Sequence, residues 1–151
     1  MSEQPKLCVQ VLPHGEGLTL PAYATPGSAG MDLRAAIAAP MSIPAGDRVQ
    51  IPTGLAMAIP KGFEGQVRAR SGLAWRKGLA VINAPGTIDS DYRGEIKVLL
   101  VNLSSDEVEI PPGERVAQLV IAPVVQVELC PVASLGETQR GDGGFGSTGT
   151  G

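Results

Sequence analysis

The sequence predicts an all-β domain, a distorted jelly-roll barrel with one short helix and a flexible C-terminal arm. Three observations support this fold class. The 151 residues include 20 Gly and 13 Pro, which separate short runs rich in Val, Ile and Leu, as in domains of many short strands. Helical periodicity is almost absent. No internal repeat suggests a propeller or solenoid, so a compact jelly-roll sandwich or barrel is expected.

The expected strands are bounded by tight turns. Apolar runs predict strands over residues 7–12, 30–36, 48–59, 64–70, 95–102, 108–110 and 115–121. The reversals between them combine Pro, which fixes φ, with Gly, which accepts the reversed backbone. Such turns are "PAGD" at 44–47, "PKGF" at 60–63 and "PPGE" at 111–114.

One helix is expected, over residues 71–78. In "SGLAWRKG", Ser71 would cap the first turn and Gly78 would end the helix about two turns later. Trp75 is expected on the apolar side of this helix, where it would pack rather than offer a stacking surface. The two cysteines, Cys8 and Cys130, are expected to be buried small hydrophobic residues.

A single domain is expected, because 151 residues with 43% hydrophobic content can form one core. Residues 1–135 would form the jelly roll. The apolar alternation weakens after Pro123, and beyond Gly136 the chain is rich in Gly, Ser and Thr. Residues 136–151 are therefore expected to form a flexible arm that belongs to the same domain.

Composition excludes several classes of partner. The net charge is −3, with 12 basic and 15 acidic residues, so neither nucleic acid nor anionic lipid is expected as a partner. No stretch approaches the roughly 18 apolar residues of a membrane span. The start "MSEQPKLCVQ" lacks a signal-peptide pattern, which predicts a cytoplasmic protein. The single histidine, His14, is expected at the surface and excludes a multi-His metal site within one chain.

Two stretches suggest phosphate chemistry, each with a simpler alternative. In "RARSGLAW", the amides of Ser71 and Gly72 would face the positive end of the helix, and Arg70 would add a charge-assisted contact. The alternative is an ordinary helix start with a surface Arg. In "NAPGTIDSDYRGE", Asp89 would act as a general base for water beside a phosphate. The alternative is that Asp89 and Asp91 form Asx turns in a loop.

Two polar residues interrupt predicted strands. Asp32 lies between Met31 and Leu33 in "PGSAGMDLRAA" and points away from both. It would face either the water shell of a Mg²⁺ ion or bulk solvent. Gln118 interrupts "RVAQLVI", where its amide would contact either a ligand or neighbouring backbone groups.

Taken together and in order, these stretches resemble a known family. The segments "AGMDLRAA", "RSGLA", "NAPGTIDSDYRGE", "RVAQLVI" and "RGDGGFGSTG" are similar to the five motifs of the homotrimeric deoxyuridine triphosphatases (dUTPases), from about Thr25 to Gly149. The resemblance implies a homotrimer with active sites at the subunit interfaces and Mg²⁺-dependent hydrolysis of dUTP to dUMP and pyrophosphate. Such an enzyme would keep uracil out of DNA and supply dUMP for thymidylate synthesis.

The resemblance also implies roles for single residues. Asp89 matches the catalytic carboxylate that activates water for attack on the α-phosphorus. Asp32 matches an acid that orients this region and the water shell of the metal. The phosphates would be held by Arg70, Ser71, Gly72 and Gln118.

Uracil selection would fall to the hairpin. Its backbone at Gly86, Thr87 and Ile88 would imitate a pairing partner, excluding the methyl group of thymine and the reversed donor pattern of cytosine. The Asn83 side chain would assist. Tyr92 matches the residue whose ring packs on the sugar and leaves no room for a 2′-hydroxyl, which would reject UTP.

The arm of one subunit would close over a site formed by the other two. Arg140 would contact the γ-phosphate, and Phe145 would stack on uracil. Further contacts to the nucleotide would come from Gly146, Ser147 and Thr148. The arm would act as a lid only when nucleotide is bound, and Asp142, which has no assigned role, is expected to face solvent.

Two alternatives to dUTP hydrolysis are considered. A dCTP deaminase is similar through the middle motifs, but the position of its catalytic Glu is occupied here by Leu99, which cannot activate water. A catalytically silent, nucleotide-binding relative would be expected to lack the Asp89 carboxylate or the arm, and both are present.

Overall fold

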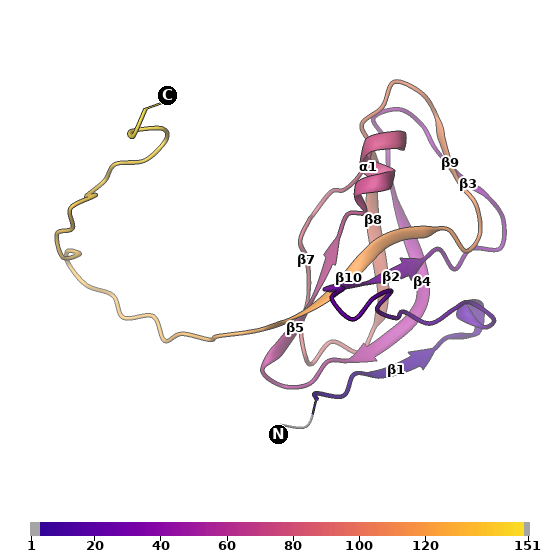
Figure 1. The fold of residues 1–151 in the computed structure, drawn as a ribbon, viewed down its shortest axis with the longest axis horizontal. Helices are drawn as coiled ribbons and strands as arrows, with labels where there is room; N and C mark the ends of the chain where they lie inside the picture. The colour runs from indigo at the N-terminus through magenta and orange to yellow at the C-terminus, as the bar shows by residue number, and fades with distance from the viewer. Residues whose placement is uncertain (1–3, 150–151) are drawn as a thin grey trace.

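The computed structural model describes residues 4–149, so the first three residues and the last two of the expected arm lie outside it. Ten strands, one α-helix and one 3-10 helix follow one another along the chain (Figure 1). They are β1 (Cys8–Val11), η1 (Pro13–Gly15), β2 (Gly30–Arg34), β3 (Met41–Ile43), β4 (Arg48–Ala58), β5 (Phe63–Arg68), α1 (Ser71–Lys77), β6 (Leu79–Val81), β7 (Gly86–Ile88), β8 (Glu95–Asn102), β9 (Val108–Ile110) and β10 (Arg115–Pro123).

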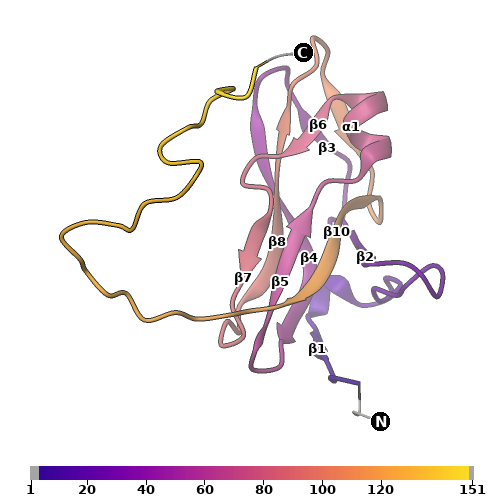
Figure 2. The same ribbon diagram turned by 60° about the vertical axis from the view of Figure 1, so that its left-hand side comes forward.

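The strands form two four-stranded sheets and a two-stranded ribbon. One sheet has the order β1-β4-β8-β6, the other has the order β2-β10-β5-β7, and β3 pairs with β9. Every pairing is antiparallel, and Figure 2 shows the sheets from the side. The predicted all-β fold class is confirmed.

Strand β8 contributes to the core by strict alternation. In β8, Ile96, Val98 and Leu100 are buried, and Lys97 between them is exposed. Leu33 of β2 and Leu119 of β10 bring the second sheet into the same cluster, and neither has any exposed surface. Truncating any of these residues to Ala would leave a cavity and cost about 2–5 kcal/mol.

The longer strands lie close to the predicted ranges, with ends that differ by up to two residues. Three strands were missed, β3, β6 and β7, along with η1. Each of these strands is only three residues long, and three residues contain too little alternation to stand out from a loop.

Helix α1 is present, but two details differ from expectation. Ser71 is its first helical residue rather than its cap; Arg70 occupies the cap position in an extended conformation and makes no side-chain capping bond. Gly78 ends the helix with a φ of 65°, as expected. Leu73 is the buried residue of the helix, and Trp75, on another face, is 90% exposed. The predicted packing of Trp75 is wrong because only one side of this outer helix touches the core.

Both cysteines are exposed, which contradicts the prediction that they are buried. Cys8 lies on the edge strand β1, where every residue is exposed. Cys130 lies in the long segment after β10. His14 is exposed as expected, and it belongs to η1, beside β4.

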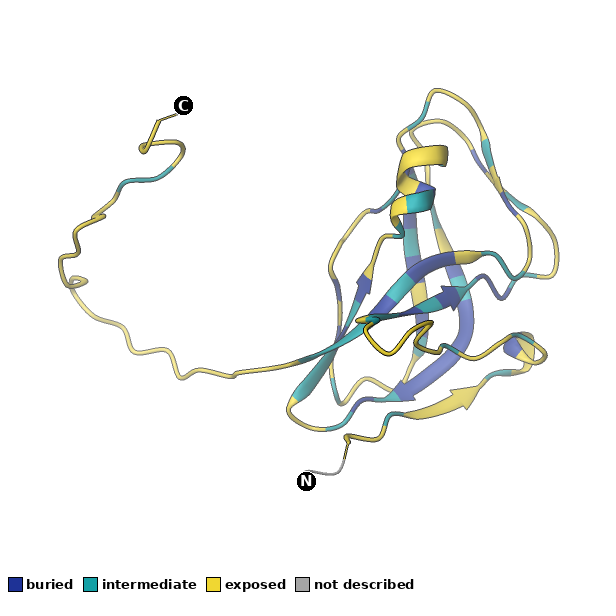
Figure 3. Ribbon diagram, viewed as in Figure 1, coloured by how far each residue is buried: buried dark blue, intermediate teal, exposed yellow. Residues whose placement is uncertain are grey.

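The chain leaves the body of the fold after β10. Residues 124–149 contain no helix or strand and extend far from the sheets in both ribbon views (Figures 1 and 2). Nearly all of them are exposed (Figure 3), including Val125, Val127 and Leu129, at 75–86%. No helix among residues 4–149 is long and apolar enough to cross a membrane.

Candidate active site

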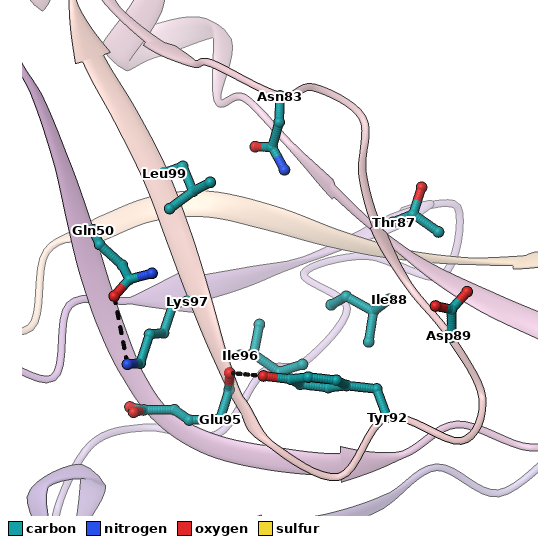
Figure 4. Close-up of a pocket in the computed structure, with 10 residues that line it drawn as sticks. All are labelled: Gln50, Asn83, Thr87, Ile88, Asp89, Tyr92, Glu95, Ile96, Lys97 and Leu99. Carbon is teal, nitrogen blue, oxygen red and sulfur yellow. Dashed lines mark hydrogen bonds between the residues drawn. The ribbon is translucent and has the colours of Figure 1, made fainter.

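A cavity of about 400 Å³ lies between the β7 hairpin and strand β8 (Figure 4). It brings together five residues to which the sequence assigned base, sugar or catalytic roles, namely Asn83, Thr87, Ile88, Asp89 and Tyr92. The opposite side is formed by residues of β4 and β8, namely Gln50, Glu95, Ile96, Lys97 and Leu99. One hairpin and one strand therefore enclose a space of the size that a nucleoside occupies.

Strand β7 holds the hairpin in place. It pairs with β5, so that Ile88 is opposite Gly65 and Gly86 is opposite Val67. Asn83 folds over Gly86: a Cβ atom at that position would lie 3.1 Å from the Asn83 amide nitrogen and 3.3 Å from the Val67 Cβ. A side chain at position 86 would require Asn83 or Val67 to shift by a few tenths of an ångström, so glycine favours this close approach of the side-chain amide to the backbone.

The turn that follows β7 presents Asp89 to solvent. The amide of Tyr92 donates to the Asp89 carbonyl at 3.1 Å, and Arg93 donates to the carbonyls of Ser90 (2.7 Å) and Tyr92 (2.9 Å). Backbone groups and one guanidinium therefore close the turn. Within residues 4–149, the carboxylates of Asp89 and Asp91 accept no hydrogen bond, so the predicted alternative of Asx turns is not observed.

Tyr92 lies along the floor of the cavity in Figure 4. Its hydroxyl donates to the Glu95 carbonyl at 3.0 Å. A Cβ atom at Gly94 would overlap the Tyr92 hydroxyl, so the glycine lets the ring fold back against the chain. The ring is 46% exposed, which leaves one face available for a ligand.

A second polar group lies on strands β2 and β10 and at the start of α1. The Asp32 carboxylate on β2 accepts from Arg70 Nε at 2.9 Å and from Arg115 Nη1 at 3.3 Å. Arg70 also donates to the Arg115 carbonyl at 3.4 Å. Gln118 on β10 stands opposite Asp32 in the β2–β10 register. Asp32 points away from buried Met31 and Leu33, as predicted.

This ion-pair group fixes the direction of Arg70. The guanidinium is held by Asp32 just before the first turn of α1, which begins with Ser71 and Gly72. The first amides of a helix have no partner within the helix and favour anions. A cation and free amides therefore occupy adjacent positions, and Arg70 is a half-buried residue paired with Asp32.

The predicted residues of the arm do not join either group within this one chain. Arg140 donates to the carbonyl of Gly143 at 2.8 Å, a contact inside the arm itself. Phe145 is fully exposed, with a φ of 50°, and the neighbouring Gly146, Ser147 and Thr148 are exposed as well. The arm extends away from the sheets (Figure 1).

Three residues near the site had no predicted role: Glu95, Arg115 and His14. Glu95 Oε1 lies 2.6 Å from His14 Nε2 and accepts from the Gly54 amide at 2.9 Å. Burial, the largest single influence, raises the pKa of the Glu95 carboxyl, but these two hydrogen bonds and the charges of His14 and Lys97 outweigh it and bring the pKa below its ordinary value. Glu95 and Arg115 stand inside quoted motifs, whereas His14 has no signal in the sequence.

Comparison with known proteins decides the family. A family model described as dUTPase matches residues 16–149. The chain belongs to the dUTPase family. Its membership confirms the predicted class of enzyme, a dUTP diphosphatase, and is consistent with Leu99, rather than an acid, lining the cavity.

Relatives in this family are close along the whole length. A deoxyuridine 5'-triphosphate nucleotidohydrolase of Aquifex aeolicus is 65% identical over 144 residues, which cover 95% of this chain and 96% of that protein. One from Rhizobium meliloti is 56% identical over 148 residues, which cover 97% of this chain and 92% of that protein.

Solved dUTPase structures share the fold. The dUTPase of Staphylococcus bacteriophage 80alpha with dUPNHPP superposes with a TM-score of 0.86 at 26% identity, covering 96% of this chain and 99% of that one. A dUTPase variant from phage phi11 of S. aureus, described with a structural Mg(II) ion, has a TM-score of 0.75 at 24% identity, covering 85% and 97%. The jelly-roll architecture is therefore that of the dUTPases.

Proposed function

We propose that this dUTPase cleaves dUTP to dUMP and pyrophosphate by attack of a water, activated by Asp89, on the α-phosphorus, with Mg²⁺ as cofactor. One observation carries the proposal. The Asp89 carboxylate stands at the edge of the cavity and accepts no hydrogen bond from residues 4–149, so it is free to accept a proton from water. The reaction would supply dUMP and keep uracil out of DNA, in the cytoplasm.

The hairpin would select the base. Gly86, Thr87 and Ile88 continue the β5–β7 ladder, and their backbone groups on the cavity side would pair with the uracil edge. Asn83, held over Gly86, would add its amide. The Tyr92 ring, fixed through its hydroxyl, would pack on the deoxyribose and leave no space for a 2′-hydroxyl.

The Asp32–Arg70–Arg115 group would bind the triphosphate. Asp32 holds Arg70 through Nε and the Arg115 carbonyl accepts from Nη1, which leaves Nη2 of the guanidinium to reach phosphate oxygens. Ser71 and Gly72 would add the amides at the start of α1, and Gln118 would contact the chain of phosphates. Donors fixed before the reaction stabilise the charge that develops on the leaving group.

Mg²⁺ fits this donor set as an ion held mainly by the substrate. Among residues 4–149, no group of three or more His, Cys, Asp or Glu side chains is placed to hold a metal, and Asp32 already has two arginine partners. Mg²⁺ keeps several waters and takes phosphate oxygens readily. Asp32 would contact such an ion through water. When bound, the ion would neutralise phosphate charge.

A homotrimer with sites at the subunit interfaces would bring together three groups that are separate in a single chain. The hairpin, the arginine group and the arm are three separate groups in the single subunit. The segment after β10 exposes Val125, Val127 and Leu129 on alternate positions, as an unpaired strand does. Contact with a neighbour would cover these side chains and bring the arm of one subunit to the site of the others.

A nucleotide panel tests the proposal. Purified protein is given dUTP, dCTP, dTTP or UTP with Mg²⁺, and pyrophosphate and ammonia are measured. Rapid pyrophosphate release from dUTP alone is expected. Release of ammonia from dCTP would instead indicate a deaminase, and binding of dUTP without turnover would indicate a silent relative.

A further inference from the structure

We propose that Glu95 is a positioning residue for sugar discrimination, which acts by fixing Tyr92 and is itself fixed by His14. The inference rests on the proposed packing of Tyr92 on the deoxyribose. Within residues 4–149, the Tyr92 hydroxyl makes one hydrogen bond, which it donates to the carbonyl of Glu95. The orientation of the ring therefore depends on how firmly this carbonyl is held.

The start of β8 lacks the regular ladder that would hold it. Along β4 and β8, Pro52 is opposite Lys97, and the next matched pair is Ala56 with Glu95. Three residues of β4 thus face a single residue of β8, a bulge that interrupts the ladder hydrogen bonds. The peptide groups around Glu95 and Ile96 need other partners.

Side chains supply those partners. Glu95 Oε1 accepts from the Gly54 amide at 2.9 Å, inside the bulge, and the Thr53 hydroxyl donates to the Ile96 carbonyl at 2.6 Å in a buried position. Glu95 is therefore held at both ends. Its carboxylate is attached to β4, and its carbonyl accepts the Tyr92 hydroxyl (Figure 4).

His14 completes the attachment from a segment far away in the sequence. Its Nε2 lies 2.6 Å from the same Glu95 oxygen. Helix η1 can approach this closely because Gly15 and Gly54 touch backbone to backbone; a Cβ on either would overlap the other residue. His14 thus favours one position of the Glu95 carboxylate among those that β4 would allow.

The charges around Glu95 support the same arrangement. Two basic side chains act on its carboxylate, His14 and Lys97, and the Lys97 ammonium is turned toward Gln50 at 3.5 Å. Other carboxylates of the hairpin, Asp89 and Asp91, have no contact with it. The direct side-chain partner of the Glu95 carboxylate is therefore His14, on a segment that does not line the cavity.

The experiment compares kcat/KM for dUTP with kcat/KM for UTP. Tyr92→Ala is expected to lower the dUTP:UTP ratio the most. Glu95→Ala should lower it about tenfold, the factor that loss of one hydrogen bond implies, through faster turnover of UTP. Glu95→Gln keeps an oxygen for Gly54 and should retain most of the ratio. His14→Ala, at an exposed position, should lower it about threefold.

A destabilised but distant variant separates positioning from folding. Ile43→Val, at the buried end of β3, should lower Tm and leave the ratio unchanged. If Glu95→Ala lowers Tm but keeps the wild-type dUTP:UTP ratio, the inference is overturned. If Glu95→Ala fails to fold, a wild-type ratio in His14→Ala would overturn it instead.

Two further outcomes concern the premises of the inference. An unchanged dUTP:UTP ratio in Tyr92→Ala would reject the sugar role of Tyr92. A wild-type protein that is inactive on dUTP would reject the proposed function itself.

Discussion

The hairpin cavity and the C-terminal arm differ in the contacts that hold them. The hairpin is held by a β-ladder, by backbone bonds in its turn and by Glu95 and Tyr92, so its shape exists before any ligand arrives. In the described part of the arm, residues 136–149, the hydrogen bonds lie within the arm itself, such as Arg140 to Gly143. The proposed base selection would therefore be preorganised, whereas the proposed closure over the phosphates would need nucleotide or a neighbouring subunit.

The largest expected effect lies at the edge of the preorganised cavity. Asp89→Asn keeps the shape of the side chain and removes the base, so kcat should fall by about 10²–10⁴ while binding of a non-hydrolysable dUTP analogue changes little. Pyrophosphate release and titration calorimetry measure the two quantities. Asp91→Asn, in the same turn and equally without side-chain partners, is the matched control and should stay near wild type. A nearly normal kcat in Asp89→Asn would remove Asp89 from the mechanism.

Deleting residues 141–151 tests the arm side of the comparison. Without the residues proposed to close over the nucleotide, kcat should fall about 10²-fold, the scale of lost positioning. The proposed trimer should persist, because its contacts are expected outside residues 141–151. Pyrophosphate release and light scattering on a sizing column check both points. Dissociation to monomers would mean that this part of the arm holds the assembly together.

A smaller effect is expected from one methyl group in the hairpin. Gly86→Ala would push against the Asn83 amide and Val67, and KM for dUTP should rise about tenfold, which corresponds to roughly 1.4 kcal/mol. Steady-state kinetics measure this change. Gly136→Ala, in the arm with no atom within 4 Å of the added Cβ, should leave KM unchanged. If the two substitutions changed KM equally, the hairpin would be no more constrained at the ligand site than the arm.

The smallest expected effect is on stability in acid. Because the pKa of folded Glu95 lies below its ordinary value of 4.5, its stabilisation is complete above that value and is lost as the pH falls through the lowered pKa. The loss should be below about 1 kcal/mol, as for a partly exposed ion pair. Thermal melts from pH 7 to pH 3 should show this loss of stability, and Glu95→Gln should remove the contribution of Glu95 to the pH dependence. The variant without residues 141–151 should behave as wild type here.

The long strands could be predicted from the sequence, because alternation over β4, β8 and β10 spans several periods. Of the three-residue strands, β9 was predicted over residues 108–110, but β3, β6 and β7 were not, although β7 carries the proposed base contacts. Trp75 and the two cysteines were misplaced for a related reason. Hydrophobic character favours burial. However, an edge strand, an outer helix and the segment after β10 have few neighbouring elements that could bury their side chains.

The sequence was sufficient to name many residues of the site, but not the contacts between them. The five motifs contain Asn83, Asp89 and Tyr92, which do meet in one cavity. The link from Asp32 to Arg115 spans 83 positions and follows from the β2–β10 register. The link from His14 to Glu95 spans 81 and follows from two glycines touching. Neither register nor close backbone approach has a local pattern.

Exposure of Trp75 gives the protein a built-in optical reporter. It is the only tryptophan in the chain, it is 90% exposed, and it lies on the short helix that begins at Ser71. Indole emission moves to shorter wavelength when the ring loses water. In a free subunit, Trp75 would therefore emit at the wavelength of hydrated indole. If an arm or a neighbouring subunit covers this helix, the emission should shift to shorter wavelength, and this shift can be measured without an added label.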